Sequence, residues 1–152
     1  QGNLKRRKRR KRRVKEPLTE ELLNELLEAP DPITFTERHR LTERTLSEYL
    51  SALLDQKGLS RSEVVHKADL NETYGYQIFM GQRKPSREKV LQIVFAMGLT
   101  LRESNRALRL AGANELYCKN RRDAIIIFCI THECSLQRTN EELYRFGEKT
   151  IG

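Results

Sequence analysis

The stretch that decides the fold is residues 59–86, which read LSRSEVVHKADLNETYGYQIFMGQRKPS. It holds two short segments that favour helix, separated by turn-forming residues at 69–71. The second helix is expected to begin at Asn71 and to run to about Met80, because Gly81 ends it. Two helices joined by so short a turn predict a helix-turn-helix, in which the second helix enters the major groove of DNA.

The sequence on both sides of this stretch continues the helical pattern. Apolar residues recur at helical spacing over about residues 45–57, 86–97 and 100–111. Ser60-x-x-Glu63 and Thr100-x-x-Glu103 have the spacing of capping boxes, and no stretch alternates as a strand does. The prediction is an all-α fold, with a five-helix domain of helix-turn-helix type at 42–112.

The C-terminal part of this pattern repeats. A shift of 35 residues places Arg87–Leu116 on Arg122–Ile151, with matches at caps, core positions and stop signals. We infer that a helical hairpin at about 86–112 is duplicated at about 121–147, so that residues 113–152 extend the same core. Asn105 and Asn140 are expected to bond to the loop that joins each hairpin. The identical pairs are Arg87/Arg122, Leu101/Leu136, Asn105/Asn140, Leu108/Leu143 and Gly112/Gly147.

The N-terminal part divides by composition. Residues 5–15 carry ten of the 29 Lys and Arg residues and no acid, so residues 1–15 are expected to form a disordered basic tail. Leu22, Leu23, Leu26 and Leu27 form one stripe of a helix at 19–29, which either packs on its own domain or binds a partner. Residues 30–41 are predicted to be a linker, so 16–41 is a helix plus linker.

Charge and cysteine content narrow the function classes. Residues 41–112 carry eleven basic and eight acidic residues, which makes them the only positive part of the chain after the tail. The odd cysteine count and the absence of C-x-x-C predict a reducing cytoplasm with no disulfide framework, and Cys129, His132 and Cys134 match no common zinc spacing. No catalytic motif, metal site or cofactor site is expected, and the longest apolar run is far too short to span a bilayer.

Residues 59–86 resemble the Cro/repressor (XRE-like) helix-turn-helix family of bacterial and phage transcription regulators. The resemblance covers about 70 of the 152 residues and includes the flanking helices. It implies a cytoplasmic, nucleoid-associated regulator, most simply a repressor, that binds double-stranded DNA as a homodimer. The matching features are Leu59-Ser60, Val64-Val65, Asp69-Leu70, Asn71–Met80, Gly81, Arg83-Lys84 and Pro85-Ser86.

The resemblance also implies which residues contact DNA. The base-reading positions fall on the start and the outward face of the second helix, and the phosphate-contacting positions flank it. The base contacts are then Glu72, Thr73, Tyr76 and Gln77, and the phosphate contacts are Arg61, Arg83, Lys84 and Arg87.

Some residues depart from the family pattern. Gly75 stands where the family places a buried branched residue, which predicts a packing gap that Tyr74 or Tyr76 fills. Phe79 and Met80 replace a polar helix end, so together they are expected to form an exposed patch suited to a protein partner. Two alternatives therefore stay open. One is a protein-interaction adaptor or antitoxin that keeps this fold without base readout, and the other is a repressor controlled by a small ligand in the C-terminal hairpin.

Overall fold

The structure is a computed structural model that describes residues 19–39 and 44–152. Every regular element in these two ranges is an α-helix, which confirms the predicted all-α class. The chain divides into two compact units, Gln1–Glu43 and Arg44–Gly152, which are described separately. The predicted basic tail at 1–15 lies outside the described residues.

The first unit contains α2 (Thr19–Glu28) and α3 (Pro32–His39). The prediction of a linker at 30–41 is therefore wrong over most of its length. Asp31 and Pro32 begin a second helix, because the Asp31 carboxylate accepts hydrogen bonds from the Thr34 N–H (2.7 Å) and the Thr34 hydroxyl (2.8 Å). Proline at the first helical position has no N–H that needs a partner. These two hydrogen bonds also lower the pKa of Asp31.

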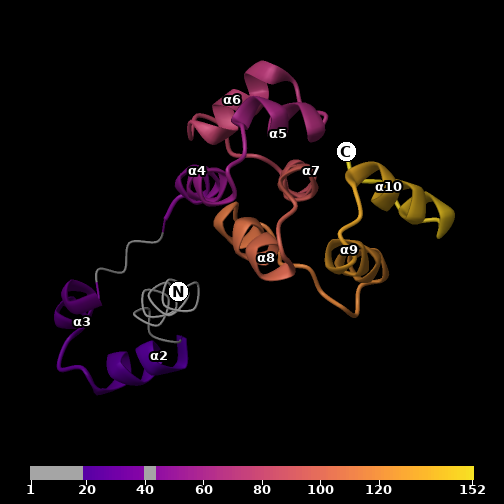
Figure 1. The fold of residues 1–152 in the computed structure, drawn as a ribbon. Helices are drawn as coiled ribbons and strands as arrows, with labels where there is room; N and C mark the ends of the chain where they lie inside the picture. The colour runs from indigo at the N-terminus through magenta and orange to yellow at the C-terminus, as the bar shows by residue number, and fades with distance from the viewer. Residues whose placement is uncertain (1–18, 40–43) are drawn as a thin grey trace, which may run out of the picture. The chain divides into compact units, whose positions relative to one another are not determined.

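The second unit holds the predicted helix-turn-helix segment and the hairpin extension. Figure 1 shows α5 and α6 at one end of this unit, α9 and α10 at another, α7 between them, and α4 and α8 on the remaining side. None of the helices in the described ranges is long and apolar enough to cross a membrane. The helices are α4 (Leu46–Lys57), α5 (Arg61–Lys67), α6 (Glu72–Phe79), α7 (Arg87–Met97), α8 (Leu101–Leu110), α9 (Arg121–Thr131) and α10 (Leu136–Arg145).

Local capping explains most of these helix boundaries. The side chains of Asn71, Thr100 and Ser135 each accept a hydrogen bond from the backbone N–H three residues later. The full capping box predicted at Thr100 and Glu103 is present. The box predicted at Ser60 is not, because the Ser60 hydroxyl pairs with that of Ser62 at 3.0 Å and makes no cap hydrogen bond.

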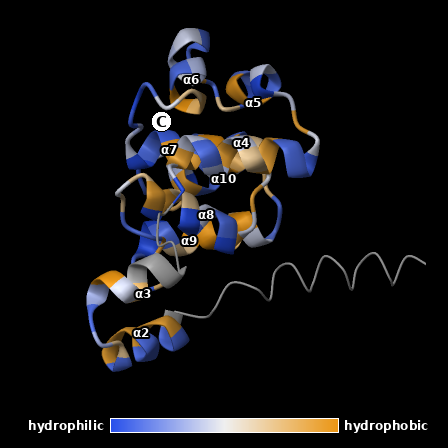
Figure 2. Ribbon diagram, turned by 90° about the vertical axis from the view of Figure 1, so that its left-hand side faces the viewer, coloured by the Kyte–Doolittle hydropathy of each residue, from blue (hydrophilic) through white to orange (hydrophobic). Residues whose placement is uncertain are grey.

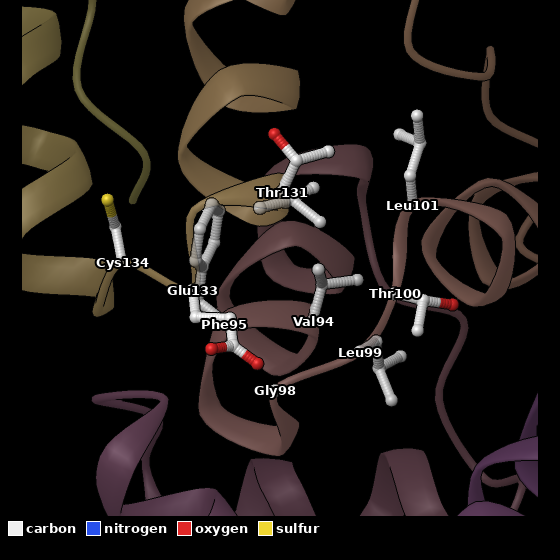
Figure 3. Close-up of a pocket in the computed structure, with 10 residues that line it drawn as sticks. Val94, Phe95, Gly98, Leu99, Thr100, Leu101, Thr131, Glu133 and Cys134 are labelled. Carbon is white, nitrogen blue, oxygen red and sulfur yellow. The ribbon is translucent and has the colours of Figure 1, made fainter.

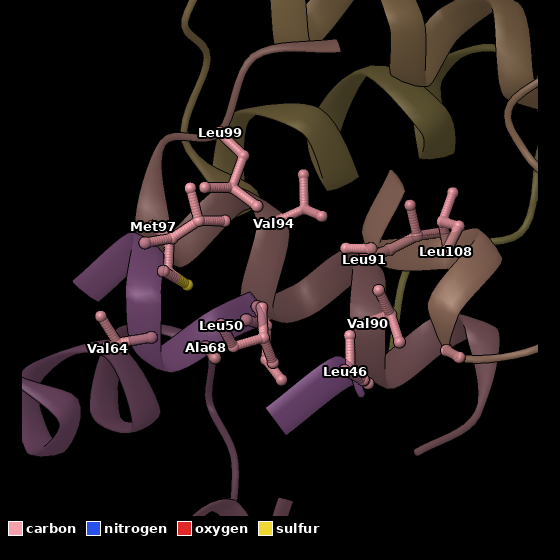
Figure 4. Packing of buried hydrophobic residues seen from close by; sticks show 14 of the residues in the cluster. Leu46, Leu50, Val64, Ala68, Val90, Leu91, Val94, Met97, Leu99 and Leu108 are labelled. Carbon is pink, nitrogen blue, oxygen red and sulfur yellow. The ribbon is translucent and has the colours of Figure 1, made fainter. Parts of the chain in front are cut away.

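One hydrophobic core runs through the whole second unit. Figure 4 shows Leu46 and Leu50 of α4, Val90 and Leu91 of α7 and Leu108 of α8 turned toward one another. Residues of the extension belong to the same cluster, as predicted, among them Leu116, Ile126, Ile130, Leu143 and Ile151. Each fully buried aliphatic side chain contributes about 1.5–3 kcal/mol relative to an exposed one. Figure 2 shows that each helix of the unit also carries hydrophilic residues between its hydrophobic ones.

The two asparagines of the repeat make the same hydrogen bond. Asn105 Oδ1 accepts from the Leu116 N–H at 2.8 Å, and Asn140 Oδ1 accepts from the Ile151 N–H at 2.7 Å. Both donors lie 11 residues beyond their acceptor, in the segment that follows each hairpin. The asparagines therefore bond not to the loop that joins the helices of each hairpin, which was the expectation, but to the segment that follows it. The same bond in both copies supports the inferred duplication.

The two repeat arginines also hold these segments. Arg87 donates to the carbonyl oxygens of 114 and 115 at 3.0 and 3.3 Å. Arg122 donates to those of 149 and 150 at 2.7 and 3.3 Å. Since 149 and 150 are 114 and 115 shifted by 35 residues, each hairpin fixes its own following segment in the same way.

The hairpins are joined by a reciprocal pair of salt bridges. Arg87 pairs with Asp123 at 2.9 Å, and Arg122 pairs with Glu88 at 2.6 Å. Glu88 and Asp123 are equivalent in the repeat, so the arginine of each copy pairs with the carboxylate of the other copy. This exchange is what a two-fold axis produces between identical subunits. The helix packing has the same symmetry, because the first helix of each hairpin packs on the second helix of the other, α7 on α10 and α9 on α8.

Candidate nucleic-acid interface

The connection between α5 and α6 is short and ordered by its own backbone. Ala68 closes α5, and Asp69 then adopts a left-handed conformation with φ of 57°. The Leu70 N–H donates to the Val65 carbonyl at 3.2 Å, and the half-buried Leu70 side chain packs on the core. Asn71 then caps α6 through the Tyr74 N–H at 3.1 Å. The direction of α6 is therefore fixed by the residues that the sequence marks as a turn.

The inner face of α6 lies very close to α5. A Cβ added at Gly75 would meet Val65 Cγ1 and Cγ2 at 2.5 and 2.6 Å. The predicted packing gap at Gly75 is therefore wrong, since Val65 already occupies that space. Tyr74 is half-buried and Tyr76 is exposed, so Tyr76 does not turn inward to fill it. Gly75 serves the close approach of two helices.

The predicted apolar patch at the end of α6 is also absent. Phe79 is buried, with 3% of its surface accessible, whereas Met80 is 50% accessible. The two side chains leave the helix in different directions because adjacent helical residues do not share a face. Ile78 and Phe79 both contribute to the core, so the end of α6 is anchored rather than available to a partner.

The outer face of α6 presents the predicted base-reading residues. Glu72, Thr73 and Tyr76 are exposed, and Gln77 is half-buried. Tyr76 is 43% accessible, so its ring and hydroxyl are partly open to solvent. The four side chains thus carry a carboxylate, two hydroxyls and an amide on one short helix.

Arg61 connects the first turn of α5 to this outer face. Its guanidinium carbon lies 4.6 Å from the centroid of the Tyr76 ring, a cation–π geometry. Its Nη1 also donates to Met80 Sδ at 3.8 Å. A cation predicted to contact phosphate is thereby held beside a residue predicted to contact a base.

Arg83, in the loop that follows α6, makes a second connection of this kind to the helix. Its Nε donates to Gln77 Oε1 at 3.1 Å, and its guanidinium lies 5.8 Å from the Tyr74 ring centroid. Because arginine only donates, the oxygen of the Gln77 amide must face Arg83, and the NH₂ group is directed elsewhere. The hydrogen bond therefore fixes the orientation of the Gln77 amide.

The remaining two predicted phosphate contacts differ. Lys84 is exposed, in the loop that follows α6. Arg87 is not free to contact phosphate, because its guanidinium already pairs with Asp123 and donates to two backbone carbonyls. Its side chain is only 25% accessible. Its role is to join the hairpins. The identity of Arg87 with Arg122 in the 35-residue repeat is a signal for this role.

The structure brings Arg61 beside Tyr76 and Arg83 beside Gln77, on the helix that also exposes Thr73. Two exposed cations thereby flank a helix face with several hydrogen-bonding groups. Such an arrangement can neutralise phosphates and contact base edges at the same time. The contacts of Tyr74 and Met80 with arginines were not predicted, because they join residues from separate elements whose approach depends on the packing of α6.

A pocket lies between the turns of the two hairpins, in the region where a ligand site remained an alternative (Figure 3). It is lined by Val94, Phe95 and Leu99 of the first hairpin and by Thr131, Glu133 and Cys134 of the second. Asn105 and Asn140 are not among its lining residues, and their amides are bonded to backbone. Within the described residues, no cluster of three His, Cys, Asp or Glu side chains is placed to hold a metal ion.

No family model, curated protein or solved structure matches the chain.

Proposed function

We propose that this protein is a sequence-specific DNA-binding transcription regulator of the Cro/repressor type that reads the major groove with α6. The observation that carries the proposal is the exposed face of α6 with two arginines held against it, Arg61 beside Tyr76 and Arg83 beside Gln77. In this proposal the protein is a repressor that acts in the bacterial or phage cytoplasm, bound at the nucleoid. Its two copies would occupy half-sites about one helical turn apart and exclude RNA polymerase.

The chemistry of each side chain supports a division of roles. Thr73 can touch a thymine methyl group, and Glu72 can accept from the amino group of cytosine. The Gln77 amide presents its NH₂ group as a donor, and its oxygen keeps one lone pair, which together suit the edge of adenine. Arg61, Arg83 and Lys84 supply positive charge for phosphates, which positions the helix without selecting sequence.

Selection from a random library of double-stranded DNA tests the proposal on the full chain. We expect enrichment of one site with two-fold symmetry. Thr73→Ala and Gln77→Ala should each relax the preference at one base position by about 1–3 kcal/mol. Thr131→Ala and Gln56→Ala are matched controls, because both residues are exposed and lie outside the α5–α6 surface.

Lys84→Ala separates phosphate contact from base readout. It should weaken binding to selected and random DNA alike and lower the slope of log affinity against log salt by about one. If no site is enriched, or if Gln77→Ala weakens selected and random DNA equally, α6 does not read bases.

The alternative of a protein-interaction adaptor loses its predicted hot spot, since Phe79 is buried. Met80 is exposed, but Arg61 already contacts its sulfur. The surface around α6 is therefore polar and cationic, which suits a nucleic acid better than an apolar partner.

A further inference from the structure

We propose that two copies of this chain associate through an apolar groove on the C-terminal hairpin, away from α6. The groove lies between α9 and α10, and we call it the hairpin groove. Phe128 of α9 is 59% accessible, and Phe146, directly after α10, is 45% accessible. The groove is lined mainly by Arg121, Ala124, Ile125 and Phe128 of α9, by Glu142 of α10 and by Phe146 directly after it.

The internal repeat shows that this kind of face is normally covered. Ile125, Phe128 and Phe146 correspond to Val90, Ile93 and Ala111 of the first hairpin, by the shift of 35 residues. The first-hairpin residues are only 1%, 0% and 5% accessible. The same face of the same hairpin is thus buried in one copy and open in the other.

Two helices cover the face in the first copy, with α4 packed on α8 and α5 packed on α7. Lys57 at its end pairs with Glu103 of α8 at 3.1 Å, and Tyr49 lies 5.1 Å under the guanidinium of Arg106. At the other end, Leu46 lines the same cleft as Ala111. Within residues 44–152, no helix takes the corresponding place on the second hairpin.

The side chains of the second copy favour a flat partner over a helix. Ala107 and Ala111 are small, which allows α4 to lie close on α8. The equivalent residues of the second hairpin are Glu142 and Phe146, whose larger side chains occupy the space that a helix equivalent to α4 would need. Phe128 is held in place by stacking on His132, with ring centroids 3.9 Å apart. A fixed, exposed aromatic face packs best against another broad apolar face.

The charges at the edge of the groove fit a second copy of the same face. The Arg121 side chain is 69% accessible and lies 3.8 Å from the carboxylate of Glu148. The Arg145 side chain is 71% accessible and lies 3.8 Å from the carboxylate of Glu142. Residues 113–152 carry six basic and six acidic residues, so two such faces do not repel each other. A two-fold interface requires this self-complementarity, because one patch must serve both partners.

This inference rests on the proposed function in one respect: binding to two DNA half-sites requires two α6 helices and therefore two copies of the chain. Its geometry is independent of DNA. The groove belongs to α9 and α10, whereas the proposed DNA surface belongs to α5 and α6. Self-association would therefore leave the α6 face of each copy available.

Sedimentation of the nuclease-treated full chain at high salt, without DNA, tests the inference. We expect the wild type to be a dimer at micromolar concentration. Phe128→Glu and, separately, Phe146→Glu should raise the dimer dissociation constant by about 100-fold or more, because each would bury an unpaired carboxylate at the interface. Tyr144→Glu should remain dimeric, since Tyr144 is 81% accessible and does not line the groove. Circular dichroism checks that each variant keeps the wild-type helix content.

A monomeric wild type would overturn the inference, as would folded Phe128→Glu and Phe146→Glu variants that remain dimeric. Loss of the dimer in Tyr144→Glu to the same extent would also overturn it, because the groove would then not be the contact. A dimer that enriches no DNA site contradicts only the proposed function. A monomer that does enrich a site contradicts only this inference.

Discussion

At the scale of single residues, Gly75 determines how closely α5 and α6 can pack. In an exposed helix, replacing glycine by alanine stabilises by about 1 kcal/mol. Here the added Cβ would lie 2.5 Å from Val65 Cγ1, so a buried side chain would have to move. We predict that Gly75→Ala lowers the free energy of unfolding by about 1–3 kcal/mol, measured by urea denaturation.

The clash can be tested by removing its other partner. Val65→Ala alone should destabilise, because Val65 is buried and the change leaves a cavity. The double variant Gly75→Ala/Val65→Ala should be more stable than the sum of the single changes predicts, since the new methyl occupies the space of the lost ones. Additive effects, or a stabilising Gly75→Ala, would show that the two helices are not in tight contact there.

At the scale of an element, the first turn of α8 couples stability to pH. Burial opposes ionisation of Glu103, but the Thr100 N–H and the Lys57 ammonium outweigh it and lower the pKa of that carboxyl. A lowered folded-state pKa gives stability that is present above the unfolded pKa near 4.3 and is lost as pH falls through the folded value. We predict that Glu103→Gln is less stable than wild type by about 0.5–1 kcal/mol at neutral pH and equal to it in acid. Thermal unfolding at a series of pH values measures the difference.

The glutamine variant is also the suitable control for the cap itself. Glutamine can still accept the Thr100 N–H, so the capping box survives while the charge is lost. Glu103→Ala removes both and should cost more at every pH. A constant difference between Glu103→Gln and wild type from acid to neutral pH would mean that Glu103 contributes no charge-dependent stability.

At the scale of the whole molecule, the reciprocal salt bridges join the extension to the rest of the unit. Arg87→Ala would leave Asp123 without its cation, and the Asp123 side chain is only 9% accessible. Arg122→Ala would leave Glu88, whose side chain is 23% accessible. Because an unpaired carboxylate costs more the deeper it is buried, we predict a loss of about 3–5 kcal/mol for Arg87→Ala and a smaller loss for Arg122→Ala. Chemical denaturation of the two variants gives the comparison.

A double-mutant cycle checks that these losses belong to the pairs. Arg87→Ala and Asp123→Asn should be strongly non-additive, because either change alone already breaks the interaction. Arg87→Ala combined with Glu88→Gln should lie closer to additivity, since Arg87 and Glu88 bond to different partners. Equal coupling in both cycles would contradict the assigned pairing.

Most of the helices could be predicted because their signals are local. Asn71 and Thr100 cap the helices that they were expected to cap, and the helix after Asn71 ends just before Gly81. α3 was missed because Asp31-Pro32 both ends one pattern and begins the next. Of the candidate site, the exposure of Glu72, Thr73 and Tyr76 follows from helical periodicity, and so does the burial of Phe79, which lies four residues after Gly75 on the same face.

The sequence by itself determined the all-α class, most helix limits and the 35-residue repeat, since caps, stop signals and periodicity act over a few residues. Only the tertiary structure decided what each side chain meets. It placed Val65 against Gly75 and paired Arg87 with Asp123 instead of leaving Arg87 free for phosphate. The physical reason is that these contacts join residues from different helices, and their geometry depends on how the helices pack.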